Sequence, residues 1–344
     1  MHPLAWKEGS LEVLDQRLLP FETRYQTLTD WPSAVEAIKN MTVRGAPLIA
    51  VAAAYGAVLA AKSPDFWHAL DELEHARPTA VNVRQAFKRI RRVAELPGSD
   101  ELRYQMTLNV ARAVETDELH SCRRIGIYGK ALLEKLWKEK RRTINVMTHC
   151  NAGRLACVDY GTATAPIYLS PEIPVHVWVS ETRPRNQGFS LTAFELAERG
   201  VAHTLIPDNA AGFLMRKGEV DMVVVGADRV TRNGDVVNKV GTYLKALAAY
   251  ESGVPFYVAL PSATYDPSLA AGDETPIETR SESEVTHLWG FDDERGEVRQ
   301  LRIAPQYARA VNYGFDVTPA KLVSGYITDK GVFGVEGLSA LAGA

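Results

Sequence analysis

Residues 222–228 read MVVVGAD, four apolar residues followed by two small ones and a carboxylate. A short apolar run that ends in small and polar residues is typical of a buried strand. Similar segments recur between residues 143 and 259, and stretches with apolar residues at three- and four-residue spacings separate them. This alternation predicts an α/β fold with a mostly parallel sheet and helices on both of its faces. The expected strands are Thr143–Met147, Val175–Val179, His203–Ile206, Met222–Val225 and Pro255–Ala259, and the expected helices are Leu155–Ala163, Ser190–Arg199, Ala210–Arg216 and Thr242–Ser252.

The first 120 residues have a different texture, because helical spacing dominates after a short strand signal near Leu11–Leu14. We therefore predict a small, mainly helical N-terminal domain over residues 1–120 and a catalytic α/β domain over residues 121–344. The Ala-rich run Pro47–Ala61 is too short to span a bilayer and is expected to be a buried helix. The expected helices are Ser33–Asn40, Pro47–Ala61, Phe66–Ala76, Asn82–Val93 and Ser99–Leu119.

The composition limits the possible partners and the compartment. A net charge of −3 over 344 residues gives no electrostatic reason to expect nucleic acid or an anionic membrane as a partner. The N-terminus lacks the pattern of a signal peptide. The three cysteines, Cys122, Cys150 and Cys157, are too few for a disulfide framework, so a cytoplasmic protein is expected.

Polar clusters follow all the expected strands. Parallel strands with right-handed crossovers place their carboxyl ends at one edge of the sheet, where ligands bind in open α/β folds. We therefore expect these clusters to line one crevice, whereas the polar stretch 270–283 is expected to be an exposed loop. The clusters are residues 149–153 (HCNAG), 181–184 (ETRP), 207–209 (PDN), 226–229 (GADR) and 261–264 (PSAT).

Cys150 stands between an expected strand and an expected helix. A helix N-terminus favours a thiolate, so Cys150 could serve as a base or nucleophile, and an inert buried thiol explains the same position equally well. Cys157 is expected to be a core residue. His149, Cys150 and Cys157 lack the spacing of zinc ligands, so no metal site is predicted.

Asp228 ends the apolar run at residues 222–228. Partial desolvation would raise the pKa of such a carboxyl and let it hold a proton for donation. It could instead cap a following helix or bind the metal of a nucleotide hydrolase. The chain has no G-x-x-x-x-G-K-S/T loop, which argues against the hydrolase, and no G-x-G-x-x-G fingerprint, which argues against nicotinamide or flavin cofactors.

Cationic side chains stand before several expected helices. Residues 44–47 (RGAP) place an arginine and a turn ahead of a helix with proline in its first turn, where free N–H groups suit a phosphate. An ordinary helix start explains the same residues. Arg77 and the pair Asn238-Lys239 have similar settings, and Gln187 lies in an expected loop.

Seven ordered motifs, spread over nearly the whole chain, resemble the methylthioribose-1-phosphate isomerases. The family that contains these enzymes also includes regulatory subunits of a translation-initiation exchange factor. The motifs are residues 42–56 (TVRGAPLIAVAAAYG), 76–82 (ARPTAVN), 148–156 (THCNAGRLA), 181–188 (ETRPRNQG), 226–243 (GADRVTRNGDVVNKVGTY), 255–266 (PFYVALPSATYD) and 315–322 (FDVTPAKL).

The resemblance implies a cofactor-independent aldose–ketose isomerase of methionine salvage, a homodimer with a Rossmann-like larger domain. Its substrate would be a phosphorylated pentose, 5-methylthioribose 1-phosphate, and its product 5-methylthioribulose 1-phosphate. Cys150 and Asp228 match the catalytic pair. The chain departs from the family at residues 311–314 (VNYG) and at Arg154, which could alter the pocket. The residues that match substrate contacts are Arg44, Gly45, Ala46, Arg77, Gln187, Asn238 and Lys239.

Two alternatives remain open at this point. The same chemistry could act on 5-deoxyribose 1-phosphate or ribose 1,5-bisphosphate. A non-catalytic regulatory subunit that binds a sugar phosphate or a protein could share the fold, because function depends on the site.

Overall fold

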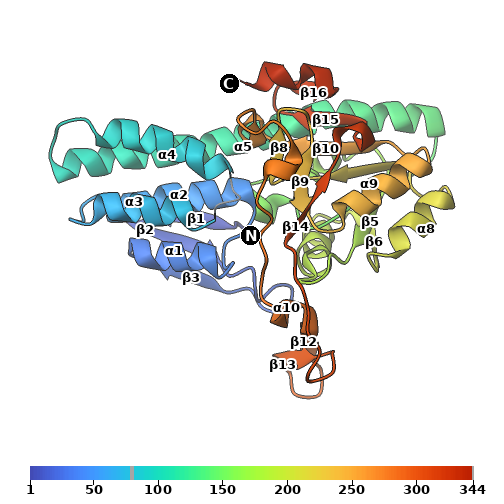
Figure 1. The fold of residues 1–344 in the computed structure, drawn as a ribbon, viewed down its shortest axis with the longest axis horizontal. Coiled ribbons are helices and arrows are strands. Elements are labelled where there is room, and N and C mark those ends of the chain that lie inside the picture. The colour runs from blue at the N-terminus through green and yellow to red at the C-terminus, as the bar shows by residue number, and fades with distance from the viewer. Residues whose placement is uncertain (78–80, 343–344) are drawn as a thin grey trace.

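The computed structural model describes residues 1–77 and 81–342, and in this part of the chain the main sheet has seven strands in the order β16-β15-β10-β7-β4-β5-β6 (Figure 1). All strands of this sheet run parallel except β16, which pairs antiparallel with β15. The predicted fold class is confirmed, and each expected strand lies within one residue of an observed one. The strands are β4 (Ile144–Thr148), β5 (Val175–Ser180), β6 (Ala202–Ile206), β7 (Met222–Val225), β10 (Phe256–Leu260), β15 (Gly325–Thr328) and β16 (Gly331–Phe333).

Both faces of the sheet are buried at β7, near its centre, which explains the uninterrupted apolar run at residues 222–225. Val223 and Val225 pack into one core with α8 and α9, whereas Met222 and Val224 pack into the core on the opposite face with α5 and α6. The helices around the sheet are α5 (Asp100–Lys140), α6 (Ala165–Tyr168), α7 (Ala193–Glu198), α8 (Ala210–Arg216) and α9 (Thr242–Glu251).

The N-terminal part combines a three-stranded antiparallel sheet with helices packed around α2. Every residue of α2 except Leu59 is buried, so the prediction of a buried helix here is confirmed. Within the described residues, the structure contains no helix with both the length and the apolarity needed to cross a membrane. The elements are β1 (Leu4–Lys7), β2 (Ser10–Leu14), β3 (Tyr25–Leu28), α1 (Trp31–Lys39), α2 (Ala46–Ala60), α3 (Phe66–His75) and α4 (Val81–Ala94).

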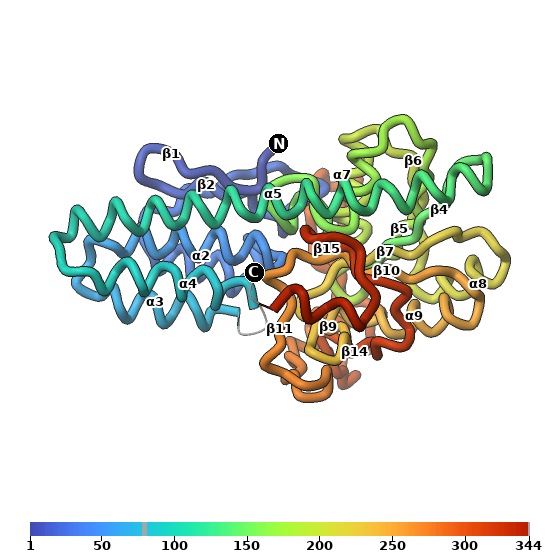
Figure 2. The backbone as a smooth tube through the Cα atoms, turned by 90° about the horizontal axis from the view of Figure 1, so that it is seen from above, coloured from blue at the N-terminus to red at the C-terminus, as the bar shows by residue number. Residues whose placement is uncertain are grey.

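Helix α5 links the two parts of the molecule. It is 41 residues long and runs from the N-terminal helices across to the main sheet (Figure 2). The Ser99 hydroxyl caps its start by accepting from the Leu102 N–H, and Arg141 ends it in a left-handed conformation. The helix expected to end at Leu119 is therefore much longer. The proposed division at residue 120 falls inside α5, and the two-domain description stays a prediction.

Two smaller sheets were not foreseen. A four-stranded sheet of order β11-β8-β9-β14 lies beside the carboxyl end of β7, and it pairs Phe315 with Lys239. A hairpin of β12 and β13 follows the short helix α10 and projects from the body of the molecule (Figure 1). The elements are β8 (Arg229–Thr231), β9 (Val236–Lys239), β11 (Tyr265–Asp266), β14 (Phe315–Thr318), α10 (Ser283–Thr286), β12 (His287–Asp292) and β13 (Glu297–Arg302).

The prediction of a helix at Leu155–Ala163 is wrong. The chain there forms only a 3₁₀ turn at Arg154–Ala156 and then bends back, so that the N–H groups of Thr162 and Ala163 both donate to the Ala152 carbonyl. The backbone N–H groups of Arg154 and Leu155 are likewise taken up by a distant carboxylate, that of Glu195, at 2.7 and 2.9 Å. These long-range hydrogen bonds override the local helical pattern.

Candidate functional site

A small cavity of about 70 Å³ lies at the carboxyl ends of β4 and β7. Of the clusters expected at the strand ends, those at residues 149–153, 226–229 and 261–264 contribute to its wall. Thr182 and Asp208, from the remaining two clusters, lie behind Cys150 and His149. The structure brings all the residues predicted for the site to this one cavity: Arg44, Gly45, Ala46, Arg77, Cys150, Gln187, Asp228, Asn238 and Lys239.

The turn before α2 forms one wall. Gly45 has a positive φ of 93°, and a Cβ at this position would lie 2.5 Å from the Ala156 carbonyl oxygen. Only glycine fits this close approach of two backbones. The neighbouring Arg44 is buried and donates from its guanidinium to both the backbone carbonyl, at 2.7 Å, and the side-chain oxygen of Asn151. Gly45 occupies the N-cap position of α2 and has no side chain with which to cap the helix, so the N–H groups of its first turn suit an anion in the cavity.

Cys150 has an unusual backbone conformation, with a positive φ of 64°. Its N–H donates to the Thr182 hydroxyl at 2.7 Å, and its sulfur lies 3.5 Å from the Gln187 side-chain oxygen. No α-helix begins directly after Cys150, so the prediction that such a helix activates this thiol is wrong. Burial raises the pKa of the thiol, while the nearby charges of Lys239 and Arg44 act in the opposite direction.

Asp228 follows β7 and leads directly into β8, so the alternative that it caps a helix is wrong. Its backbone N–H donates to the Val237 carbonyl at 3.0 Å. Burial raises the pKa of its carboxyl, against the lowering effect of Lys239 and Arg77. The carboxyl is therefore biased toward the protonated form that a proton donor requires.

Three cations converge on the cavity. Lys239 is buried, donates to the Gly314 carbonyl at 2.9 Å and lies 4.8 Å from the centre of the Phe315 ring. Burial lowers the pKa of its ammonium group. Arg77 lies 3.6 Å from the Glu278 carboxylate. Together with Arg44, these side chains make the cavity suitable for an anion.

Two features bear on the details of the sequence motifs. Pro78, Thr79 and Ala80, which belong to the motif at residues 76–82, lie outside the described residues. Arg154 does not line the cavity, because its guanidinium pairs with Glu198 and donates to the Met1 carbonyl at 2.7 Å. This departure from the family pattern therefore lies away from the cavity wall.

Sequence reasoning missed two carboxylates near the cavity, Glu278 and Glu195. Glu278 comes from the stretch expected to be an exposed loop, yet it faces Arg77. Glu195, from an expected helix, holds the loop after Cys150 through the Asn151 side chain at 2.9 Å and two backbone N–H groups. No local pattern marks either carboxylate, because their partners are distant in sequence. Within residues 1–77 and 81–342, no group of three or more His, Cys, Asp or Glu side chains could hold a metal ion.

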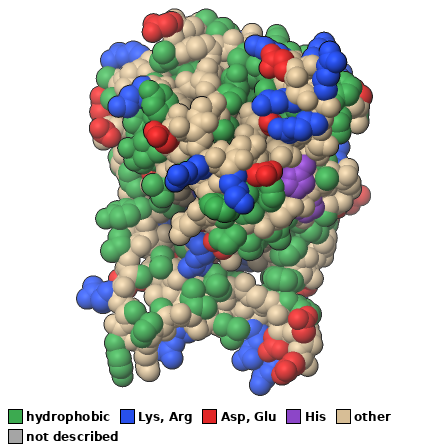
Figure 3. Space-filling view, turned by 90° about the vertical axis from the view of Figure 1, so that its right-hand side faces the viewer, with side chains coloured by type: hydrophobic (Ala, Val, Ile, Leu, Met, Phe, Trp, Pro, Cys, Tyr) green, Lys and Arg blue, Asp and Glu red, His purple; other side chains and the backbone are tan. Residues whose placement is uncertain are grey.

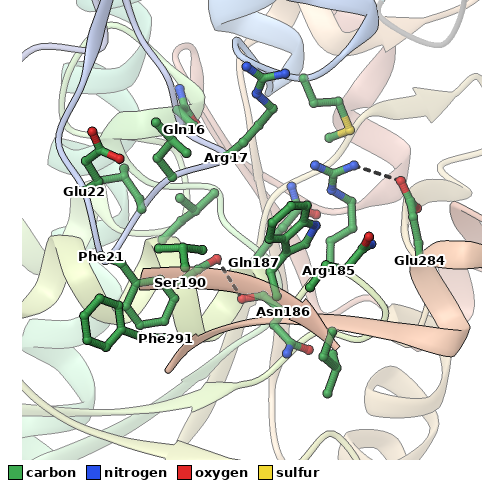
Figure 4. A pocket seen from close by; sticks show the side chains of 18 of the residues that line it. Gln16, Arg17, Phe21, Glu22, Arg185, Asn186, Gln187, Ser190, Glu284 and Phe291 are labelled. Atoms are coloured by element: carbon green, nitrogen blue, oxygen red, sulfur yellow. Dashed lines mark hydrogen bonds and ion pairs between the residues drawn. The ribbon is translucent and has the colours of Figure 1, made fainter. Parts of the chain in front are cut away.

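A larger cleft of about 730 Å³ adjoins the cavity beneath the β12–β13 hairpin and shares Met41, Arg44 and Gln187 with it. Figure 4 shows Phe21 and Phe291 side by side at this cleft, and their ring centres are 5.7 Å apart. The apolar side chains of the lining are Leu18, Leu19, Phe21, Met41, Pro184, Leu191, Leu288, Trp289, Phe291 and Val298.

Curated relatives match almost the entire chain. The methylthioribose-1-phosphate isomerase of Rhodospirillum centenum is 50% identical over 348 residues, which cover 98% of this chain and 91% of that protein. The protein of the same name from Sulfurimonas denitrificans is 50% identical over 336 residues, which cover 94% of this chain and 91% of that protein.

Solved structures agree with this relationship. The crystal structure of 5-methylthioribose 1-phosphate isomerase from Pyrococcus horikoshii is 35% identical with a TM-score of 0.85, and the match covers 99% of this chain and 95% of that one. The structure of translation initiation factor eIF-2B, subunit delta, from A. fulgidus is also 35% identical, with a TM-score of 0.78 and coverage of 96% and 95%.

A family model described as the initiation factor 2 subunit family matches residues 42–334. The family predicted from the ordered motifs is thus confirmed by full-length relatives, by solved structures and by the family model. The chain belongs to the initiation factor 2 subunit family and, within it, to the methylthioribose-1-phosphate isomerases.

Proposed function

We propose that this chain converts 5-methylthioribose 1-phosphate into 5-methylthioribulose 1-phosphate, as an isomerase of methionine salvage. The observation that carries the proposal is that Cys150 and Asp228 line one cavity together with three cations. Relatives about 50% identical over nearly the whole chain are named for this activity. The predicted enzyme class, an isomerase, is confirmed by these relatives.

The cations and the start of α2 suit the phosphate group. Arg44, Arg77 and Lys239 supply positive charge, and the uncapped N-terminus of α2 supplies backbone donors and a favourable dipole. Gln187 and Asn238 add neutral amides that can contact the sugar hydroxyls. These contacts hold the sugar beside the two catalytic groups.

The 1-phosphate locks the anomeric carbon, so the ring has to be opened by acid catalysis. In our proposal the protonated Asp228 donates to the ring oxygen as the bond between that oxygen and C1 breaks. The hydrogen on C2 moves to C1, and the C2 hydroxyl returns a proton to the Asp228 carboxylate and becomes the ketone, while the phosphate stays attached. Burial of Asp228 supports this role, because it raises the pKa of the carboxyl.

Cys150 can take part in the hydrogen transfer in two ways. As a thiolate it would remove the C2 proton, and the C1 position of the resulting enediol would then be protonated. In a hydride shift the hydrogen would move directly with its electron pair, and Cys150 would only shape the site. The fate of deuterium placed at C2 separates the routes, since exchange with water accompanies proton removal and full retention accompanies the hydride shift.

The adjoining cleft favours the methylthio sugar over ribose 1,5-bisphosphate. Its apolar lining suits a thioether, whereas a second phosphate would need cations that are not already held in close, hydrogen-bonded ion pairs. Arg17 and Arg185, the cations of this cleft besides Arg44, are paired with Asp15 at 2.6 Å and with Glu284 at 2.8 Å. A 5-deoxy sugar would fill less of the same apolar space and should be turned over less efficiently.

The regulatory-subunit alternative receives less support. Sequence identity to these two solved structures does not separate the two functions, since the isomerase and the initiation factor subunit are each 35% identical to this chain. The presence of both Cys150 and Asp228 at the cavity is what a catalytic protein needs and a purely regulatory one does not.

We also propose that the protein is a cytoplasmic homodimer. Free cysteines suit a reducing compartment. Hydrophobic side chains are exposed on the side of the molecule that carries α8 and α9, and Figure 3 shows such side chains among charged ones on this side. An exposed apolar face of this kind suits contact with a second copy. The exposed residues on these helices are Phe213, Tyr243, Leu244, Leu247 and Tyr250.

The test is a comparison of kcat/KM for the three sugars, with purified protein and no added metal or cofactor. The proposal expects the highest value for 5-methylthioribose 1-phosphate. Absence of ketose product from all three sugars would contradict it, and a preference for ribose 1,5-bisphosphate would contradict the substrate assignment.

A further inference from the structure

Cys150, on the cavity wall, is hydrogen-bonded to Thr182 behind it, and both residues are strained. Cys150 and Thr182 have positive φ values of 64° and 66°, in the left-handed region that side chains rarely adopt. For a β-branched residue such as Thr182 this conformation is a clear outlier. The two residues follow neighbouring parallel strands, β4 and β5, and the Cys150 N–H donates to the Thr182 hydroxyl at 2.7 Å.

Asp208 holds the backbone of Thr182 in this conformation. Its carboxylate accepts from the backbone N–H groups of Thr182 at 3.0 Å and Arg183 at 2.8 Å, and also from the Ser180 hydroxyl. Lys245 lies 3.4 Å away and supplies a balancing charge. Strained conformations persist only where several interactions enforce them together, and here the enforcing carboxylate comes from a different strand end.

His149 fixes the orientation of the Thr182 side chain. The ring of His149 is fully buried, and burial lowers its pKa to about 3, so it is neutral at physiological pH. Its Nε2 lies 2.9 Å from the Val240 carbonyl, which can only accept, so Nε2 carries the proton. The Thr182 hydroxyl lies 3.3 Å from the unprotonated Nδ1 and 3.0 Å from the Ser180 carbonyl oxygen. The hydroxyl hydrogen thus has acceptors, which leaves the oxygen free to accept from Cys150.

The other side of Cys150 is held in the same way. The Thr192 hydroxyl donates to the Cys150 carbonyl at 2.7 Å and accepts from the Asn151 side chain at 3.1 Å. Thr192 lies on a π-helical turn at Gly188–Thr192, an element that often marks functional sites. Gln187, just before this turn, faces the sulfur of Cys150. The segment 187–192 therefore contacts both the carbonyl and the sulfur of Cys150, while Thr182 holds the N–H from the end of β5.

We propose that Thr182 is a positioning residue that, together with Thr192, clamps Cys150 in its left-handed conformation and fixes its thiol in the cavity that Asp228 lines. A misplacement of about 1 Å at a reacting group can lower turnover about 100-fold. Precise placement of the thiol can therefore outweigh the cost in stability of two strained residues. The effect on turnover rests on the proposed isomerase function. The effect on the reactivity of the thiol does not.

The experiment compares Thr182→Val, Thr182→Ser and Thr182→Gly with the wild-type protein. The valine variant keeps the shape and loses the hydroxyl, so kcat should fall about 10- to 100-fold while KM stays within about threefold. Serine keeps the hydroxyl and should restore kcat to within about threefold. Glycine relieves the backbone strain, so it should keep a wild-type melting temperature and still show the low kcat of the valine variant.

A second readout needs no substrate. The rate at which iodoacetamide alkylates Cys150, followed by peptide mass spectrometry, should rise at least about threefold in Thr182→Val and stay unchanged in Thr182→Ser. Thr328→Val serves as the matched control, because Thr328 is a buried threonine outside the cavity lining whose hydroxyl donates to the Gly331 carbonyl and accepts from the Lys330 N–H. That control should leave kcat and alkylation unchanged.

Wild-type kcat and wild-type alkylation in Thr182→Val would overturn the clamp. So would a loss of kcat in all three Thr182 variants that merely follows a loss of thermal stability. If the wild-type protein shows no isomerase activity, the proposed function fails, and the alkylation rates alone still decide whether Thr182 positions Cys150.

Discussion

The substitution Gly45→Ala tests whether the turn before α2 has to approach the 3₁₀ turn at Arg154–Ala156. An alanine held at the positive φ of Gly45, 93°, costs about 1–2 kcal/mol. At this position the new Cβ would also lie 2.5 Å from the Ala156 carbonyl oxygen and 2.6 Å from its Cα. Overpacking of this kind adds about 1–3 kcal/mol, so the free energy of unfolding should fall by about 2–5 kcal/mol.

The clash would displace the first turn of α2, and this displacement should weaken substrate binding. Moving the first turn of α2 away from the cavity also moves Arg44 and the free N–H groups of the helix, so KM should rise about tenfold or more. The assays are equilibrium denaturation and steady-state kinetics on 5-methylthioribose 1-phosphate.

Gly9→Ala provides the matched control. Gly9 has a similar φ of 82°, and nothing lies within 4 Å of the Cβ that alanine would add. This variant should therefore show only the backbone strain, about 1–2 kcal/mol, with an unchanged KM. Equal losses of stability in the two variants, together with a wild-type KM for Gly45→Ala, would refute the reasoning.

Three other perturbations have defined outcomes. Lys239→Met removes a buried charge from the cavity and should raise KM at least about tenfold, as expected for a lost charge-assisted contact of about 1.5–3 kcal/mol; an unchanged KM would contradict the phosphate assignment. Glu195→Ala leaves the Asn151 amide and two backbone N–H groups without the carboxylate that accepts from them. The free energy of unfolding, measured by denaturation, should therefore fall by about 3 kcal/mol or more. A fall below about 1 kcal/mol would argue that Glu195 does not hold this loop. Burial raises the pKa of Glu284, but Arg280 and Arg185 outweigh it and lower the pKa from 4.5 to about 2. The stabilisation that the ionised Glu284 gives the folded protein is therefore present above pH 4.5 and is lost as the pH falls toward 2. In Glu284→Gln the free energy of unfolding should vary less with pH in this window. An unaltered pH dependence would be inconsistent with this ion pair.

The main sheet could be predicted because each of its strands is marked by a short local pattern in the sequence. The run at residues 222–225 is buried on both faces, and such strands are short apolar runs that end in small and polar residues. The edge at which their carboxyl ends meet follows from the parallel topology, so the positions of Cys150 and Asp228 at one cavity could be anticipated. The ordered motifs added the remaining cavity residues.

The rest depends on contacts between distant segments. The loop after Cys150 follows a helical pattern in sequence, but the Glu195 carboxylate captures the N–H groups that a helix would need. Strand β9 pairs with β14 some 75 residues later, a partnership that no local pattern reveals. Glu278 reaches Arg77 from a polar stretch that reads as solvent-exposed. In each case a tertiary interaction outweighs the local preference.

The most direct test measures ketose formation from 5-methylthioribose 1-phosphate by Asp228→Asn and Cys150→Ser, alongside calorimetric binding of the same sugar. We predict that turnover falls about 100-fold or more in each variant, while the dissociation constant changes by no more than about threefold. Wild-type turnover in either variant would contradict the assignment of the catalytic pair.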